Sequence, residues 1–465
     1  MRTRNGQSGD GTAESPEQGE QQDQEGEKRG LTVGVVATRL DGTDGVSLEA
    51  AKLADTLRRT GHKVAYFGGA LGERFQPGHV VPCAHFETQM NRWLELECFG
   101  LHGHLSGPAQ DALRDQTNEL HDALLAFVAE FDVDVIIAEN CLSIPMQLPL
   151  GLALTAVLER TGIRSIGHHH DFFWERERFG ARPLAVDLVL SRAFPPRLPD
   201  MQHLVIHSAA GRELRRRIGA EPTLLPNVMD FDRDPLTHGL AGDGARFRDA
   251  IGLDGRHHVL LHPARVIPRK NIEASVELAA ALSGSGVPRV ALVVTHAEGD
   301  EGTEYGAAVR RLAERLDVDM RFTATRPDGQ GGGAGCPTLA DAYAAADLVT
   351  YPSTVEGFGN ALLESFYYRR PVLVNRYRVY EDDIAPAGVH CIEISGGRLS
   401  RAAVSRARDW LLTPGRWEES AERNFEIGRE RFSYQVLRDR LLPVLGRPGP
   451  DPSPATERPA SLVAS

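Results

Sequence analysis

Two glutamates eight positions apart flank a glycine turn in the second half of the chain. Glu356 and Glu364 bound the segment EGFGNALLE, which follows the apolar run LVTYPS and begins a helical pattern. A helix N-terminus leaves backbone N–H groups unsatisfied, and carboxylates accept hydrogen bonds from sugar or ribose hydroxyls. The segment therefore predicts a site for a sugar or an anion. A plain strand-turn-helix with solvated glutamates fits the same spacing.

Three cations follow an earlier apolar run. Arg265, Arg269 and Lys270 lie in ARVIPRKN, between VLLHP and an expected helix with Asn271 as its N-cap. An arginine fork and a lysine point charge beside a helix N-terminus suit a diphosphate. A solvated basic turn is the alternative. Because the whole chain carries a net charge of −12, three cations at one turn favour a ligand role.

Three consecutive histidines, His168, His169 and His170, invite a metal interpretation. Side chains alternate between the faces of a strand, so only His168 and His170 would point the same way. No His/Asp/Glu triplet elsewhere in the sequence has convincing metal-ligand spacing, which disfavours a metal. Structural histidines at a strand end are the plainer alternative.

The elements around these residues alternate between short apolar runs and amphipathic stretches. This pattern predicts two doubly wound α/β domains in tandem, whose ligand lies in a cleft where the carboxyl ends of the strands face each other. The expected strands cover 31–37, 64–67, 134–138, 203–207, 258–261, 290–295, 348–351 and 371–375. The expected helices cover 46–57, 272–282, 340–346, 360–367 and 416–442.

The expected boundaries follow from composition and pattern. Residues 1–30 and 447–465 lack large apolar side chains and are expected to be disordered tails. The first domain is expected over 31–226 and the second over 227–415, joined near Leu225-Pro226-Asn227-Val228. A last helix is expected over 416–446.

The composition excludes several classes of protein. The chain has 465 residues, 25% of them charged and 41% hydrophobic, and a net charge of 52 − 64 = −12. This balance argues against a nucleic-acid binder. Five scattered cysteines give neither a disulfide framework nor a zinc site. No apolar run is long enough to span a membrane and no secretory signal is present, so we expect a cytoplasmic protein.

Taken together, the Glu356/Glu364 element and the Arg265/Lys270 pair resemble those of family 4 retaining glycosyltransferases, which have the two-domain GT-B fold. The resemblance covers about residues 31–445 and includes Pro226-Asn227 as the linker and a final helix that crosses back to the first domain. It implies that Arg265 and Lys270 hold the donor diphosphate. It also implies that Glu364 binds the ribose hydroxyls and that Glu356 lies beside the transferred sugar.

The resemblance assigns further residues to the donor and the acceptor. The N–H groups of Gly357, Phe358 and Gly359 would bind sugar hydroxyls or phosphate. The turn from Gly42 to Gly45 matches the first-domain loop that approaches the phosphates, although the usual adjacent glycine pair is absent. The remaining assignments place His170 and Asp171 at the donor sugar, Arg176 and Arg178 at an anionic acceptor and Asn140 on the acceptor side.

The resulting expectation is a retaining hexosyltransferase. It would use a nucleotide-diphosphate sugar of the GDP-mannose or UDP-glucose type, with no metal or other cofactor, and a hydroxyl acceptor such as a small sugar or glycerate-type solute. The alternatives are a transferase for a surface polysaccharide or lipid-linked acceptor, a phosphorylase or inverting transferase, and a non-catalytic sugar-nucleotide-binding subunit. Peripheral membrane contact through the basic run 212–217 and the oligomeric state both stay open.

Overall fold

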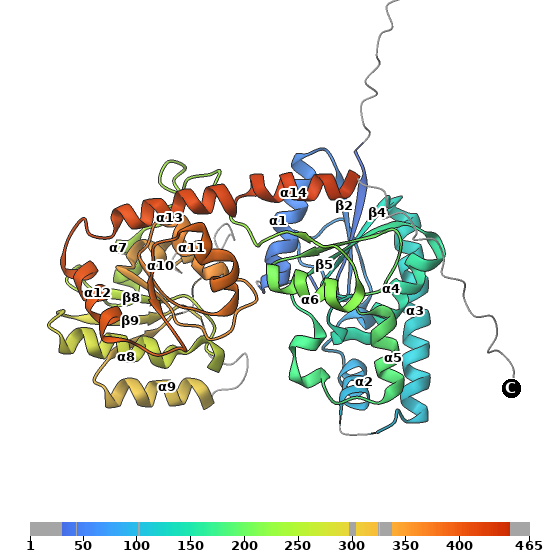
Figure 1. Ribbon diagram of the computed structural model, residues 1–465, viewed down its shortest axis with the longest axis horizontal. Helices are drawn as coiled ribbons and strands as arrows, with labels where there is room; N and C mark the ends of the chain where they lie inside the picture. The colour runs from blue at the N-terminus through green and yellow to red at the C-terminus, as the bar shows by residue number, and fades with distance from the viewer. Residues whose placement is uncertain are drawn as a thin grey trace, which may run out of the picture. The chain divides into compact units, whose positions relative to one another are not determined.

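The computed structural model describes residues 30–42, 44–100, 103–296, 304–323, 325 and 337–446 (Figure 1). Almost all of both expected tails, and Thr43 within the first glycine turn, lie outside these ranges. Within the described residues the chain forms two parallel sheets. Each has helices packed on both of its faces.

The first sheet has seven parallel strands in the order β3-β2-β1-β4-β5-β6-β7. Its strands are β1 (Thr32–Val36), β2 (Lys63–Gly68), β3 (Gly78–Val80), β4 (Val135–Glu139), β5 (Arg164–His169), β6 (Met201–Val205) and β7 (Thr223–Leu224). Its helices are α1 (Gly45–Arg59), α2 (Gln89–Phe99), α3 (Gly107–Phe131), α4 (Leu148–Thr161), α5 (Leu184–Ala193) and α6 (Ser208–Ile218).

The second sheet has six parallel strands in the order β10-β9-β8-β11-β12-β13. Its strands are β8 (His258–His262), β9 (Val290–Val294), β10 (Asp319–Phe322), β11 (Leu348–Tyr351), β12 (Val372–Asn375) and β13 (Ile392–Ile394). The helices of this half are α7 (Gly244–Ala250), α8 (Ile272–Gly284), α9 (Glu304–Arg315), α10 (Leu339–Ala345), α11 (Asn360–Tyr367), α12 (Arg401–Leu412) and α13 (Glu418–Arg431). The last helix, α14 (Tyr434–Gly446), packs instead on the first half.

Alternation along the strands explains why each sheet is covered on both sides. In β1, Val33 and Val35 pack into one apolar cluster with Leu53 of α1, whereas Val36 packs into another with Leu124 of α3. Successive side chains of a strand point to opposite faces, so a strand with no polar position needs a helix layer on each side. The second sheet follows the same rule, with separate clusters on its two faces.

The expected helix over 416–442 is wrong in one respect, because the structure contains two helices there. α13 ends at Arg431 and α14 begins at Tyr434. Between them the backbone N–H of Met229 donates to the carbonyl of Phe432, which ties the break to the segment that follows the first domain. Leu437 and Leu441 of α14 then join the apolar cluster that α1 covers.

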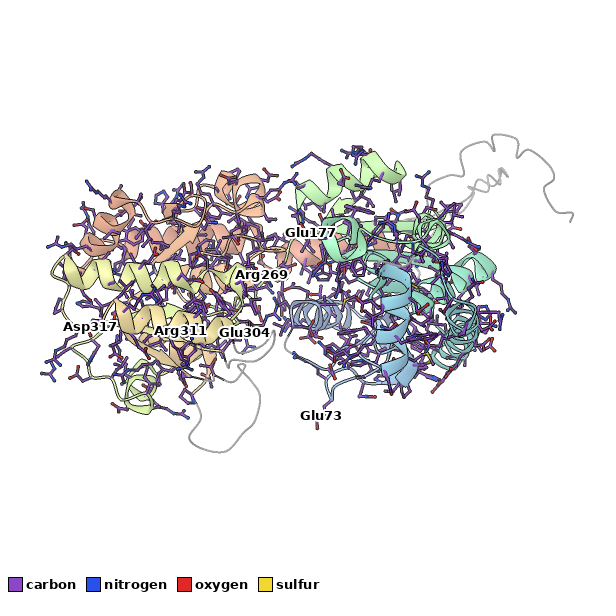
Figure 2. All side chains as sticks on the ribbon, turned by 90° about the horizontal axis from the view of Figure 1, so that it is seen from below. Glu73, Glu177, Arg269, Glu304, Arg311 and Asp317 are labelled. Carbon is purple, nitrogen blue, oxygen red and sulfur yellow. The ribbon has the colours of Figure 1, made fainter. Side chains whose placement is uncertain are left out.

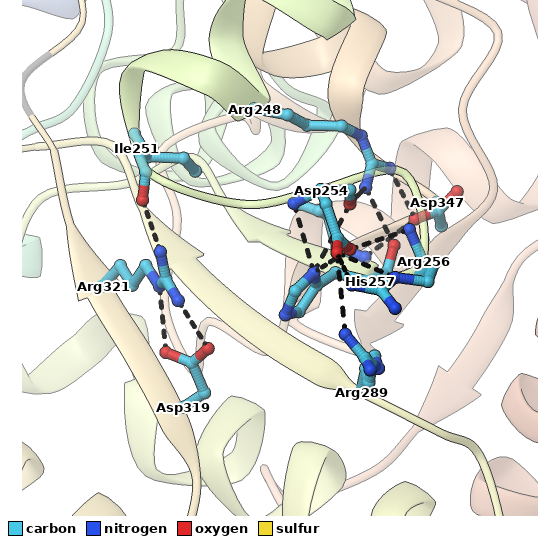
Figure 3. A network of polar contacts seen from close by, with 10 residues as sticks. Arg248, Ile251, Asp254, Arg256, His257, Arg289, Asp319, Arg321 and Asp347 are labelled. Carbon is cyan, nitrogen blue, oxygen red and sulfur yellow. Dashed lines mark hydrogen bonds and ion pairs between the residues drawn. The ribbon is translucent and has the colours of Figure 1, made fainter.

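A polar network lies at the amino ends of the second sheet's strands (Figure 3). Arg248 of α7 contacts Asp347, which directly precedes β11, at 2.9 Å, and Asp347 accepts a hydrogen bond from the N–H of Val259 in β8. Arg321 of β10 pairs with Asp319 at 2.8 Å. These contacts fasten α7 and neighbouring strands at the amino ends of the strands, whereas Arg265, Lys270 and Glu356 follow the carboxyl ends of β8 and β11.

No helix in the described part of the chain is both long and apolar enough to cross a membrane.

Candidate active site

Most of the predicted site residues follow the strands on either side of the point where each sheet reverses its strand order, and the others, from His170 to Arg178, follow β5, the neighbour of β4. In the second sheet β8 lies between β9 and β11, and in the first sheet β1 lies between β2 and β4. Chain connections leave such neighbouring strands in opposite directions, which opens a crevice beyond their carboxyl ends. The loops after β1, β4, β8 and β11 therefore form the positions where a ligand binds in folds of this kind.

Glu356 and Lys270 meet beyond β8 and β11. The Lys270 ammonium lies 2.5 Å from the Glu356 carboxylate, and the Arg269 guanidinium, labelled in Figure 2, lies 3.1 Å from it. The side chains of Glu356 and Lys270 are 7% and 10% exposed. The 3₁₀ turn η5 (Pro268–Lys270) and the turn before α11 place these groups, so two segments 86 residues apart build one charged centre.

Burial and charge act in opposite directions on this pair. Burial lowers the pKa of Lys270, and Glu356 opposes that shift. Burial raises the pKa of Glu356, but Lys270 and Arg269 outweigh it and leave this pKa below its usual value. We take the pair as ionised at neutral pH, because the two groups lie 2.5 Å apart and each charge favours the charged form of the other.

The glycine turn before α11 presents backbone donors next to this pair. Gly359 adopts φ 132°, and its carbonyl accepts from the N–H groups of Leu362 and Leu363, which starts the helix. The Phe358 side chain is buried in the core, so only its backbone faces a ligand. Within the described residues no group accepts a hydrogen bond from the N–H of Gly357, Phe358 or Gly359.

The other predicted donor residues lie on the same elements. Arg265 is exposed in the β8–α8 loop, close enough for its charge to lower the pKa of Lys270. Glu364 lies within α11, where its carboxylate accepts a hydrogen bond of 2.8 Å from the Tyr343 hydroxyl. Asn271 occupies the N-cap of α8 but does not cap it, because its amide instead donates to the carbonyls of Pro352 and Gly397.

The first glycine turn joins β1 to α1. Asp44 caps the helix, and its carboxylate accepts from the N–H groups of Val46 and Ser47. Gly45 is the first residue of α1, and a Cβ added to it would meet nothing within 4 Å. A Cβ on Gly42 would come 3.1 Å from the Asp44 carboxylate. The tight approach in this turn therefore concerns Gly42 rather than Gly45.

The histidine run meets a carboxylate that the sequence analysis did not select. Glu139, the last residue of β4, is fully buried, and its carboxylate lies 3.0 Å from Nδ1 of His168 and 2.5 Å from Nε2 of His170. Burial raises the pKa of Glu139, but the two imidazoles outweigh it and leave this pKa at about 2. His168 and His170 do share a face, as strand alternation predicts, and their ring centroids are 4.5 Å apart.

These three residues also form the metal-ligand candidate of the described chain, with ligand atoms all within 4.8 Å of one another. Two ligands of a tetrahedral zinc at about 2.0–2.1 Å would lie about 3.3 Å apart. The 2.5 Å contact between Glu139 and His170 is much shorter than that edge. The geometry therefore fits a hydrogen-bonded carboxylate better than a metal centre.

Asn140 connects the ends of β4 and β5. It adopts φ 59°, and its Oδ1 accepts from the backbone N–H groups of His170, at 3.0 Å, and Asp171, at 3.4 Å. Its amide donates to the Asp171 carboxylate at 3.1 Å, and that carboxylate also pairs with Arg176. Arg178 instead lies 3.6 Å from Glu95 of α2. The structure thus brings Asn140, His170, Asp171 and Arg176 together, and directs Arg178 to a different partner.

The basic run 212–217 on α6 is neutralised by neighbouring carboxylates. Arg216 and Arg217 pair with Glu213, and Arg215 pairs with Glu221. The Arg217 guanidinium also lies 4.6 Å from the centre of the Trp174 ring. These contacts favour a solvated helix face over a surface for anionic lipid.

Glu139 is the residue that sequence reasoning missed. Its signal was present, since a carboxylate closes the apolar strand VIIAE immediately before Asn140. A charge at the carboxyl end of a buried strand is expensive to bury without partners, so it indicates a paired group. Which partners it has could not be read from the chain, because His168 and His170 belong to another strand.

Comparisons with known proteins show the family of this chain. Residues 244–392 match the family described as glycosyl transferases group 1. The chain is 30% identical to the mannosylglucosylglycerate synthase of Thermotoga maritima, covering 86% of this chain and 96% of that protein. It is 28% identical to the mannosylglucosylglycerate synthase of Petrotoga mobilis, covering 88% and 100%.

The fold is also shared with solved structures. The structure of Anabaena HepE in complex with UDP and glucose matches with a TM-score of 0.62 at 15% identity, covering 89% of this chain and 99% of that one. At that identity the likeness shows the fold alone, which is the GT-B arrangement of two Rossmann-like domains. Together with the full-length relatives, it supports the conclusion that this chain belongs to the group 1 glycosyl transferases.

Proposed function

We propose that this glycosyltransferase belongs to family 4 and transfers a hexose from a nucleotide-diphosphate sugar with retention of anomeric configuration. The buried contact between Lys270 and Glu356, with Arg269 beside it, carries the proposal. Cations held beyond β8, next to unpaired N–H groups before α11, suit a diphosphate whose negative charge grows as the glycosidic bond breaks.

Each donor residue then has a distinct role. Lys270 and Arg265 stabilise the leaving diphosphate, and Glu364 binds the ribose hydroxyls. Glu356 lies beside the transferred sugar and holds the Lys270 ammonium in place. The acceptor hydroxyl attacks from the face that the diphosphate leaves, and a phosphate oxygen takes its proton, so no protein general base is assigned. Arginine and lysine take the charge-neutralising role, and we propose no metal.

The acceptor is proposed to be a small glycerate-type solute that carries a carboxylate. The support is the name of the two full-length relatives, mannosylglucosylglycerate synthase. In that name the mannosyl group is outermost, which favours a mannose donor and a glucosylglycerate-type acceptor. Arg176, whose side chain is 49% exposed beside Asp171, is the cation available for the acceptor carboxylate.

The test is a transfer assay with a matched variant. Purified protein is incubated without metal with GDP-mannose or UDP-glucose and glucosylglycerate, and the product is identified by NMR, which also gives the anomeric configuration. A product with retained configuration, and a thermal shift with one nucleotide that Lys270→Ala abolishes, would support the proposal. Inverted configuration, or no glycoside from any donor, would contradict it.

A further inference from the structure

Three consecutive histidines lie near the Glu139 carboxylate: His168 and His170 bond to it, and His169 stands between them in the chain. Only one of the three has a ring nitrogen that is free to act on a ligand. Nε2 of His168 and Nδ1 of His169 are sealed from solvent with no hydrogen-bond partner in the described chain. Nδ1 of His170 is not among the sealed nitrogens, and no described residue bonds to it. His170 lies at the end of β5, directly before Asp171.

This difference decides where a positive charge can reside. A proton on Nε2 of His168 would be a buried donor with no acceptor in the described chain, which is costly. His168 therefore bonds to Glu139 through Nδ1. His170 donates Nε2–H to the same carboxylate and can carry a second proton on Nδ1 without sealing it from solvent.

We propose that Glu139 is a positioning residue for His170: it holds the imidazole by Nε2, keeps it protonated, and so presents Nδ1–H toward the sugar during transfer. This deepens the proposed function and rests on it for the identity of the ligand. Asn140 complements it by holding the His170 backbone N–H at 3.0 Å. His170 would contact substrate, and Glu139 would act only through it.

The charges around His170 support a protonated ring. Burial lowers the pKa of His170, but the hydrogen bond and charge of Glu139, with smaller effects of Glu49 and Asp171, outweigh it and raise this pKa. His168 faces the ring from β5, and Glu49 faces it from α1. The carboxylates among these neighbours favour the imidazolium.

The test reads His170 directly. Protein labelled at the histidine Cε1 position is titrated by NMR, with the His170 signal assigned from the spectrum of His170→Asn. In the wild type we expect a His170 midpoint above 6.5. In Glu139→Gln it should fall by about one pH unit or more, because an opposite charge in contact has been removed. An unchanged midpoint in folded Glu139→Gln would overturn the proposal.

Turnover gives a second measurement. Loss of an oriented, charged hydrogen-bond donor is expected to lower kcat/KM by about 10- to 100-fold, somewhat less than removing such a donor altogether. The nucleotide-induced thermal shift should remain, because it depends on the second domain. The matched control is Glu130→Gln, which breaks a surface pair of the same 3.0 Å length with His79 and should change neither the His170 midpoint nor the rate.

The remaining outcomes separate the possible failures. If Glu139→Gln does not fold, the wild-type titration still tests the idea, since a His170 midpoint at or below 6.5 would overturn it. One equivalent of bound metal in the wild type, lost in Glu139→Gln, would overturn it in favour of a metal site. A wild-type protein whose His170 midpoint lies above 6.5 but which transfers no sugar would contradict the proposed function. The same result would still support the pairing of Glu139 with His170.

Discussion

Each domain buries one glutamate between two basic side chains at the carboxyl edge of its sheet, but the chemistry of the partners differs. Glu356 pairs with Lys270 and Arg269, whose charges persist across the physiological pH range. Glu139 pairs with His168 and His170, whose charge depends on pH. The second domain thus holds a fixed positive charge suited to a diphosphate. The first domain holds a titratable proton. Nε2 of His168 is buried without a partner whereas Nδ1 of His170 is not, so the proton resides on His170.

The largest effect should come from removing the fixed charge. Lys270→Ala is expected to lower kcat by about 10²- to 10³-fold, because a preorganised cation at the leaving diphosphate is lost. Steady-state kinetics measure this, with Lys63→Ala, an exposed lysine at the start of β2, as the control. Near-normal turnover of folded Lys270→Ala would remove Lys270 from the reaction.

Replacing each buried glutamate by glutamine should lower the free energy of unfolding, and the loss should be larger for the glutamate of the second domain. At pH 7 an unpaired lysine of pKa 10.5 needs about 5 kcal/mol to lose its proton, whereas a histidine needs almost none. We expect Glu356→Gln to lower the free energy of unfolding by about 3 kcal/mol and Glu139→Gln by about 1–2 kcal/mol. Urea unfolding at pH 7 measures both. Equal losses would contradict the distinction between fixed and titratable partners.

Alanine substitution should also lower the free energy of unfolding by different amounts in the two glycine turns. Gly359 has φ 132°, and an added Cβ would come 2.2 Å from the Tyr377 hydroxyl, whereas a Cβ on Gly45 meets nothing within 4 Å. Gly359→Ala should lower the free energy of unfolding by about 1–3 kcal/mol through strain. Gly45→Ala should leave it nearly unchanged. Thermal unfolding tests the pair, and a harmless Gly359→Ala would show that the turn relaxes.

The last prediction concerns stability in acid. Burial lowers the pKa of His203 to about 4, and His203 lies 3.0 Å from His169 within the first sheet. The unfolded chain binds this proton near pH 6.5 and the folded chain only near 4, so its contribution to stability is complete above 6.5. That contribution is lost as the pH falls toward 4, at about 1.4 kcal/mol per pH unit.

His203→Asn is therefore expected to flatten the acid side of the stability curve by about one proton. Denaturant unfolding at pH steps from 7 to 4 measures the slope. His262, in the second domain, has its pKa lowered by burial to about 3 and serves as the internal reference, because it should continue to titrate in the variant. An unchanged slope would mean that His203 is not the group that resists protonation.

Much of this comparison was visible in the sequence. The strand at 348–351 and the helix at 360–367 have the expected bounds, because apolar runs bounded by Gly and Pro are strong local signals. Several strands were not predicted. β10 has only partly buried or exposed positions and β7 only two residues, so neither carries a clear apolar pattern. The split between α13 and α14 was hidden because the helical pattern continues on both sides of Phe432.

The predicted site residues likewise fall into two groups: those marked by a local motif, and those whose role depends on partners from distant segments. Glu356, Lys270 and Arg265 were selected because each lies in a short motif beside a glycine turn or a helix start. Glu139 carries no such local motif, and only its neighbours in the sheet show what it does. Asn271 had a plausible local role as a helix cap, but its amide bonds instead to the carbonyls of Pro352 and Gly397. The contact of Arg178 with Glu95 of α2 also could not be read from the local sequence.

The sequence by itself determined the α/β class, the order of the elements and the residue types available for a diphosphate. These depend on periodicity and on neighbours within a few residues. Only the tertiary structure decided which carboxylate meets which base. Parallel strands bring together residues from distant segments, such as Glu139 with His168 and Lys270 with Glu356. Burial then selects the protonation state of each pair, and neither pairing nor burial is encoded in any single stretch of chain.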